Sequence, residues 1–182
     1  LYLIKLGNDE RLLDKKNNRL GIITERNMPE LSFREINIDT ERKEFLLERY
    51  DKAREDFLAL RDAKTKTRDK AVKVQLDKME KIAGRLLTYL SENPEKIPAA
   101  QKFIDYYQDR ALMLTNRYFD LTDTGLQTAE VTERREKVIR ALFLMDEAYE
   151  AEFHKVLAAD FMDIDAEIDV IENNMKVAGI TE

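Results

Sequence analysis

The sequence predicts an all-α fold, an antiparallel bundle of three to four long helices with an overlong or kinked C-terminal helix. Three observations predict this fold class. Glycine and proline number only 5 and 3 among 182 residues, too few for the turns of a sandwich, a barrel or a doubly wound sheet. Charged residues make up 37% of the chain beside an ordinary apolar share of 43%, as in helices with a wide solvated face. Apolar residues also recur at three- and four-residue steps over most of the chain.

The sequence predicts two parts, an N-terminal arm at 1–38 that is weakly structured or docked, and a helical bundle domain at 39–182. The arm has no clean apolar period, and its first six residues suit either a strand or the end of an upstream helix. The first clear helix is predicted to begin after Asp39, a good N-cap, and its apolar stripe stops at Ala63. The polar run 64–68 is then predicted to be the tip of a helical hairpin.

Helix-breaking residues bound the second and third predicted helices. The second carries an apolar stripe from Val72 to Leu90 and ends before Pro94, because proline lacks the backbone donor and disfavours helical geometry in the residue before it. The third begins at Pro94 or Pro98, since proline is acceptable as a first helical residue. Gly125 is predicted to end it in the left-handed conformation.

The fourth helical stretch begins at Thr128 or Thr132, and its apolar stripe continues for about 50 residues, which would span roughly 75 Å. The second and third helices would each be only about half as long. The last helix must therefore overhang the bundle or bend near 158–160. Short connections make the neighbouring helices antiparallel. An overhanging stripe needs a partner, either the N-terminal arm or another chain.

Charge is unevenly distributed along this chain, whose formal net charge is −6. Residues 61–85 carry nine bases and four acids, whereas residues 146–172 carry ten acids and one base. One interpretation is two solvated faces of a single complementary bundle. The other is that the basic tip binds lipid headgroups or an acidic protein, while the acidic end binds a basic partner. Binding to nucleic acid is not expected of an acidic chain. The predicted anion or membrane surface consists of Lys64, Lys66, Arg68, Lys70 and Lys73.

The residue types restrict the chemistry open to this chain. It has no cysteine, which excludes thiolate nucleophiles and Cys-ligated metals, and its single histidine, His154, excludes a His-rich site within one chain. It has no Gly-rich phosphate loop and no nucleophile elbow. The carboxylates of 160–172 suit a hard cation, but one helix face converges poorly on one ion. We predict no catalytic residue, no metal site and no cofactor; the alternative is a metal-dependent phosphoesterase that uses these carboxylates on small phosphate monoesters.

Four segments in order resemble the XpaC-like family, which is named for 5-bromo-4-chloroindolyl phosphate hydrolysis. They are residues 92–98, 103–107, 112–118 and 163–172, and the similarity covers roughly 40–178. The resemblance implies a helical, often membrane-associated bacterial protein, and a toxic-anion-resistance (TelA-like) protein as partner. The family name records a phenotype on a chromogenic phosphate and identifies no catalytic residue that can be carried over.

Together these patterns predict a non-catalytic helical interaction module of a bacterial, membrane-associated protein, linked to toxic-anion resistance. Its partner is expected to be a protein, such as a TelA-like one, or a second copy of the chain. We expect a cytoplasmic location, or one at the cytoplasmic face of a membrane reached through a region upstream of Leu1. A further alternative is a module that binds anionic membrane surfaces. The predicted partner-binding residues are Phe161, Ile164, Asp165, Ile168, Asp169 and Ile171.

Overall fold

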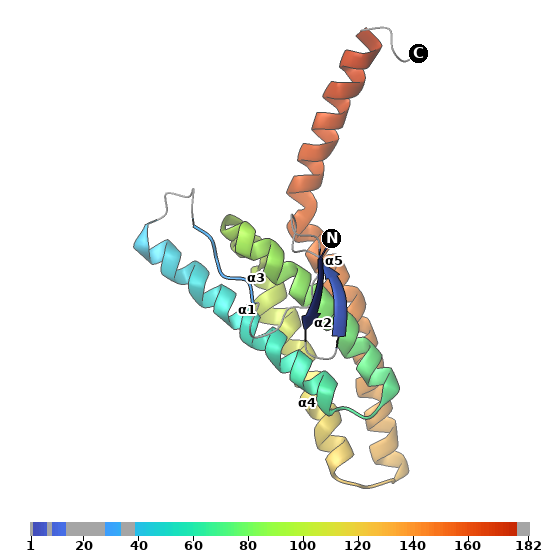
Figure 1. Ribbon diagram of the computed structural model, residues 1–182. Coiled ribbons are helices and arrows are strands. Elements are labelled where there is room, and N and C mark those ends of the chain that lie inside the picture. Colours follow the sequence, from blue (N-terminus) through green and yellow to red (C-terminus); the bar gives the residue numbers. More distant parts are fainter. Residues whose placement is uncertain (1, 7–8, 14–27, 34–38, 178–182) are drawn as a thin grey trace.

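Helices dominate the computed structural model, which describes residues 2–6, 9–13, 28–33 and 39–177 (Figure 1). The predicted all-α fold class is therefore confirmed. α3, η2 and α4 follow one another without a gap and form one composite helix, in which η2 is a π-helical segment. The helical elements of the described residues are α1 (Thr40–Lys66), α2 (Lys70–Glu92), the 3-10 helix η1 (Pro94–Lys96), α3 (Ile97–Lys102), η2 (Phe103–Gln108), α4 (Asp109–Asp123) and α5 (Ala129–Val177).

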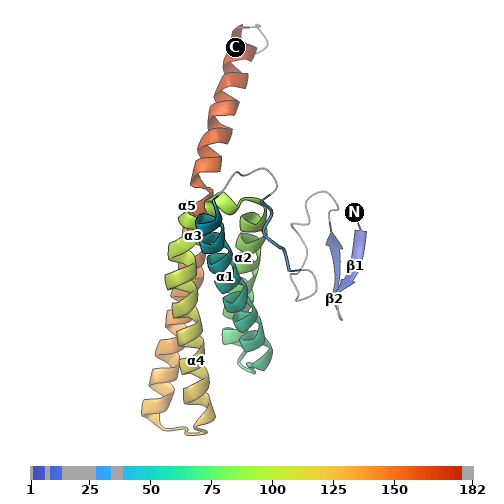
Figure 2. The same cartoon turned by 90° about the vertical axis from the view of Figure 1, so that its left-hand side faces the viewer.

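A small β-hairpin lies near the N-terminus and stands apart from the helices in Figure 2. Strands β1 (Tyr2–Leu6) and β2 (Asp9–Leu13) pair in antiparallel orientation, with Tyr2 opposite Leu13. The sequence left two possibilities for its first residues, a strand or the end of an upstream helix, and the structure has a strand at Tyr2–Leu6.

Residues 28–33 of the arm lie against the bundle. The backbone N–H of Ser32 donates to the carbonyl of Ser91 at 3.0 Å, and the Tyr50 hydroxyl donates to the carbonyl of Pro29 at 2.7 Å. Leu31 and Phe33 pack on the core with their side chains partly buried. The remaining positions of the arm lie outside the described residues, and the division into an arm of 1–38 and a bundle of 39–182 stays a prediction.

The predicted helix ends are confirmed where capping residues mark them. Asp39 accepts a hydrogen bond from the backbone N–H of Arg42 at 2.8 Å, which satisfies one of the free donors at the start of α1. The predicted hairpin tip at 64–68 is wrong for 64–66, because polar side chains do not interrupt a helix and α1 continues to Lys66. The connection is the three residues 67–69, and Asp69, which the sequence analysis did not single out, caps α2 in the same way as Asp39 caps α1. Gly125 has φ +65°, the left-handed conformation that ends a helix at little cost in glycine.

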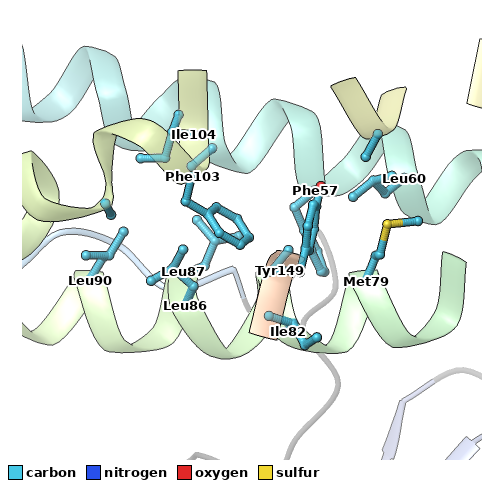
Figure 3. Packing of buried hydrophobic residues seen from close by; sticks show 14 of the residues in the cluster. Phe57, Leu60, Met79, Ile82, Leu86, Leu87, Leu90, Phe103, Ile104 and Tyr149 are labelled. Atoms are coloured by element: carbon cyan, nitrogen blue, oxygen red, sulfur yellow. The ribbon is translucent and has the colours of Figure 1, made fainter. Parts of the chain in front are cut away.

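The core lies between α1, α2, η2 and the first half of α5, as Figure 3 shows. Phe103 and Tyr149 meet in its centre with ring centroids 4.6 Å apart. The whole apolar stripe predicted for the second helix is buried, because α1 and α5 cover it from two sides. That stripe consists of Val72, Leu76, Met79, Ile82, Ala83, Leu86, Leu87 and Leu90.

Helix α5 is one continuous helix of 49 residues, much longer than the 23 residues of α2 or the 27 of α1. Its first half packs against α2 and α4. Its second half extends beyond the bundle in both views, and in Figure 1 the helix changes direction where it leaves its neighbours. The predicted overlong C-terminal helix is therefore confirmed.

Candidate interaction surfaces

We call residues 161–177 of α5 the overhang. Every side chain of the overhang is exposed except that of Met175, which is partly buried. The predicted partner-binding residues all belong to this segment, and its apolar members stand open to solvent: Phe161 is 40% exposed, Ile164 51%, Ile168 46% and Ile171 57%. Isolated exposed apolar side chains are ordinary, but a row of them along one segment is typical of an interaction site.

Five of the apolar residues of the overhang follow a heptad pattern, whereas the exposed Met162 and Val170 lie on the opposite face of the helix. Phe161, Ile164, Ile168, Ile171 and Met175 alternate steps of three and four, so they occupy the a and d positions of a coiled-coil seam on one helix face. At 100° per residue, acidic side chains flank this face on both sides. Those on one side are Asp165, Asp169 and Glu172, and those on the other are Asp160, Asp163 and Glu167.

Among the described residues, the acids of the overhang form no ion pair, although the charge of Asp163 acts on Lys96. Asp163, Asp165, Glu167, Asp169 and Glu172 form no ion pair with any residue that the structure describes. The overhang also contains a single base, at its C-terminal end. This segment therefore presents an apolar stripe inside an uncompensated negative field, which attracts a basic surface from a distance.

Asp160 fastens α5 to the bundle at the point where the overhang begins. Its carboxylate accepts hydrogen bonds from the Tyr89 hydroxyl at 2.5 Å and from Lys96 Nζ at 2.8 Å. The Lys96 ammonium, and then the Tyr89 hydroxyl, lower the pKa of Asp160, because both favour the charged carboxylate. The ring of Tyr89 also packs edge-on against Phe153, which lies about two turns of α5 before Asp160. These contacts hold α5 against the bundle at the residue where the overhang begins.

His154, the single histidine of the chain, precedes the overhang on α5. It is exposed, and its ring lies 5.2 Å from the ring of Phe161, the first residue of the overhang. In the part of the chain that the structure describes, no three His, Asp or Glu side chains are placed to hold a metal ion. The carboxylates of 160–172, on which the phosphoesterase alternative depends, therefore do not converge on one another.

The second predicted surface, the basic tip, lies where α1 turns into α2, and we use that name for Lys64, Lys66, Arg68, Lys70 and Lys73. Two of its bases are neutralised locally, since Lys64 pairs with Glu80 and with Asp77, and Lys66 pairs with Asp62. The other three, Arg68, Lys70 and Lys73, make no ion pair with described residues.

An open groove of about 590 Å³ lies in the basic tip. Its lining is mostly apolar, because exposed Val74 and the methylene stems of the lysines supply most of it. Figures 1 and 2 show that the basic tip and the overhang lie at opposite ends of the molecule. The groove is lined by Lys64, Lys70, Lys73, Val74, Asp77 and Lys78.

A third polar group, which the sequence did not reveal, surrounds the π-helix η2. Lys52 Nζ donates to Asp56 at 2.8 Å, to Asp109 at 2.6 Å and to the carbonyl of Ile104 at 3.3 Å. Burial alone would lower the pKa of Lys52, but its hydrogen bonds to Asp109 and Asp56 outweigh that effect and raise it. Lys52 thereby donates to a carbonyl of the π-helical segment, where i to i+5 bonds replace the regular i to i+4 ladder.

Tyr149 lies beside this polar group. Its hydroxyl is fully buried without a hydrogen-bond partner among the described residues, and burial, followed by the charges of Asp56 and Asp109, raises its pKa. Because the side chain has no exposed surface, its hydroxyl does not meet a substrate in solution in this conformation. The group around η2 is therefore a structural feature of the bundle. The only hint of it in the sequence is the i, i+4 spacing of Lys52 and Asp56.

The described residues include no helix that is both long and apolar enough to cross a lipid bilayer. The overhang is shorter than the roughly 20 residues that a span needs, and five acids interrupt its apolar residues.

Comparison with known proteins yields one family. Neither the curated proteins nor the solved structures contain a significant match to this chain. A family model described as 5-bromo-4-chloroindolyl phosphate hydrolysis protein matches residues 20–171. The match begins in the arm, includes every helix of the bundle and extends along the overhang as far as Ile171. It thus includes both candidate surfaces, and over that length the chain belongs to the 5-bromo-4-chloroindolyl phosphate hydrolysis protein family, the one that the sequence resembled.

Proposed function

We propose that this chain is a non-catalytic protein-interaction module whose overhang binds a basic, helical partner surface. One observation carries the proposal: the bundle is complete at Asp160, yet the same helix continues with an uncovered heptad stripe between two rows of acids. Folding gains nothing from exposing that stripe, whereas a partner that covers it removes apolar area from water.

The acids of the overhang indicate the charge that the partner carries. Charges beside an apolar seam contribute to partner choice and to the rate of encounter more than to affinity. A partner with lysines or arginines on both sides of an apolar ridge matches the overhang, and an acidic helix is rejected by like charge. This chemistry is compatible with the TelA-like partner that the resemblance implies, with a role in toxic-anion resistance, and with a cytoplasmic or membrane-apposed setting.

The proposal is tested by comparing two triple variants of the full chain. The first, Ile164→Gln with Ile168→Gln and Ile171→Gln, removes the seam but keeps good helix formers. The second is a matched control on the other face of the overhang, Met162→Gln with Ala166→Gln and Val170→Gln. We expect the first variant to lose its partners in a quantitative pull-down from the native lysate, while the control retains them. Equal retention by both variants would contradict the proposal.

The family description favours a second candidate function, a metal-dependent phosphoesterase that acts on small phosphate monoesters. Its carboxylates would be those of 160–172, with Asp163 and Asp165 the residues to remove. The test is turnover of a chromogenic phosphate by the purified chain with Mg²⁺, Mn²⁺ or Ca²⁺. Turnover that disappears in the variant Asp163→Asn with Asp165→Asn would support the phosphoesterase over the interaction module.

The unpaired bases of the tip favour a third candidate, binding to anionic membrane surfaces. Bases near such a surface contribute about 1 kcal/mol each, and added salt screens them. Binding to phosphatidylserine vesicles that is lost at high salt, and lost in the variant Lys70→Glu with Lys73→Glu, would support this candidate. Binding that persists in the variant would contradict it.

A further inference from the structure

We infer that the surface covering the overhang is the basic tip of a second copy of this chain, so that two copies associate in antiparallel orientation. This inference rests on the proposed function, because it names the partner of the same apolar stripe. It depends on three features of the described residues: the charge beside the seam, the shape and charge of the groove, and the positions of the two surfaces in the molecule.

Charge excludes the simplest way for two copies to associate, by pairing overhang with overhang. With Phe161 at an a position, Asp165 and Glu172 fall at e positions and Glu167 falls at g. In a parallel pair, Glu167 would face Glu172 of the other copy. In an antiparallel pair, e positions would face each other, again acid against acid. Like charges at these positions oppose association, so the overhang requires a basic surface.

The basic tip supplies the positive charge that the overhang lacks. The lining residues from α2 are Lys70, Lys73, Val74, Asp77 and Lys78, whose spacing places them along one side of that helix. Lys64 of α1 completes the lining, so the groove lies beside α2, and the inference places another helix along that side. Val74, 52% exposed, offers an apolar contact to the isoleucine row, and Lys70 and Lys73 form no ion pair with an acid in the described part of the chain.

The placement of the two surfaces makes the contact intermolecular. The overhang and the basic tip lie at opposite ends of the molecule in both views, so one copy does not fold its overhang onto its own tip (Figures 1 and 2). The 17 residues of the overhang extend about 25 Å, enough to follow the groove. Two copies placed antiparallel each contribute one overhang and one tip. The contact then forms twice around a two-fold axis, which doubles the buried area.

The inference is tested by charge exchange in the full chain, with molar mass measured by light scattering and sedimentation at 50 mM and 500 mM salt. The tip variant is Lys70→Glu with Lys73→Glu, and the overhang variant is Asp165→Lys with Glu172→Lys. We expect the natural sequence to form dimers at low salt that dissociate at high salt. Each variant alone should associate at least about tenfold more weakly. An equimolar mixture of the two should dimerise again, because each overhang then meets a tip of opposite charge.

A matched control reverses two exposed bases elsewhere, Arg117→Glu with Lys137→Glu, which changes the net charge as much as the tip variant does. This control should dimerise like the natural sequence. A monomeric natural chain at 200 µM and low salt would overturn the inference, as would a mixture that stays monomeric. If the chain is monomeric and the tip variant instead loses binding to anionic vesicles, the tip is a membrane surface and the inference is wrong. If the chain is monomeric but the isoleucine variant still loses a partner in the pull-down, the inference fails while the proposed function stands.

Discussion

The two halves of α5 share one helical pattern but have opposite surroundings. In the first half, Leu142 and Tyr149 are fully buried and Val156 is 4% exposed. In the second half, Ile164, Ile168 and Ile171 recur at helical steps of four and three and are about half exposed. The pattern specifies a helix and an apolar face in both halves. Whether that face is covered depends on neighbouring elements, which flank only the first half.

The part of α5 that is covered is limited by the length of the neighbouring helices. The helices that flank α5 are 23 to 27 residues long, counting the composite helix formed by α3, η2 and α4 from Ile97 to Asp123. The last side-chain hydrogen bonds between α5 and its neighbours are those of Asp160 with Tyr89 and Lys96. Since an isolated helix of this length is marginal in water, the overhang depends on its continuity with the bundle for its stability.

Amide hydrogen exchange should show the largest difference between the two halves. Amides of 138–156 exchange only when the bundle opens, which costs several kcal/mol, whereas amides of 165–177 exchange through fraying. We expect the second set to exchange at least about 1,000-fold faster, measured by mass spectrometry on peptides from the free monomeric chain at high salt. Similar protection in both halves would mean that another surface covers the overhang.

Equivalent truncations in the two halves should differ in their cost to stability. Leu142→Ala removes a fully buried side chain and should lower the free energy of unfolding by about 2–5 kcal/mol. Ile168→Ala removes a half-exposed one and should change it by less than about 0.5 kcal/mol. Urea unfolding of the monomeric chain measures both values. A large cost at Ile168 would show that its side chain is buried in solution.

The smallest expected effect concerns the junction between the halves. Asp160→Asn removes the charge that Lys96 and Tyr89 stabilise, and should lower stability near neutral pH by up to about 1 kcal/mol. Because the pKa of Asp160 is lowered in the folded chain, its contribution is present above the unfolded value near 4 and is lost as the pH falls through the folded value. The difference in melting temperature between the natural sequence and the variant should therefore be constant from pH 5 to 8 and shrink towards pH 2.

Tyr89→Phe is the control for that junction, because it removes a donor and leaves the ion pair of Asp160 with Lys96 intact. Its effect should be smaller than that of Asp160→Asn near neutral pH. If Asp160→Asn has no effect at any pH, the ion pair does not fasten the overhang.

The helix ends could be predicted from the sequence more reliably than the interior of the third helix. Asp39 and Gly125 act through their own side chain or backbone, so each of these helix ends is visible in a few residues. The π-helical segment η2 was not predicted. Its carbonyl at Ile104 accepts a hydrogen bond from Lys52 of α1, 52 residues away in the sequence. A contact with so remote a side chain leaves no local pattern in the sequence.

By itself, the sequence determined the all-α class, the helix ends at Asp39 and Gly125, the apolar face of each helix and the two regions of opposite charge, because these follow from local spacing and composition. Tertiary structure alone decided which part of the long stripe is buried, which of the described lysines form no ion pair, and that the basic tip and the overhang lie at opposite ends of the molecule. The physical reason is that burial and ion pairing depend on what lies across from a residue, and that is fixed only when the helices pack.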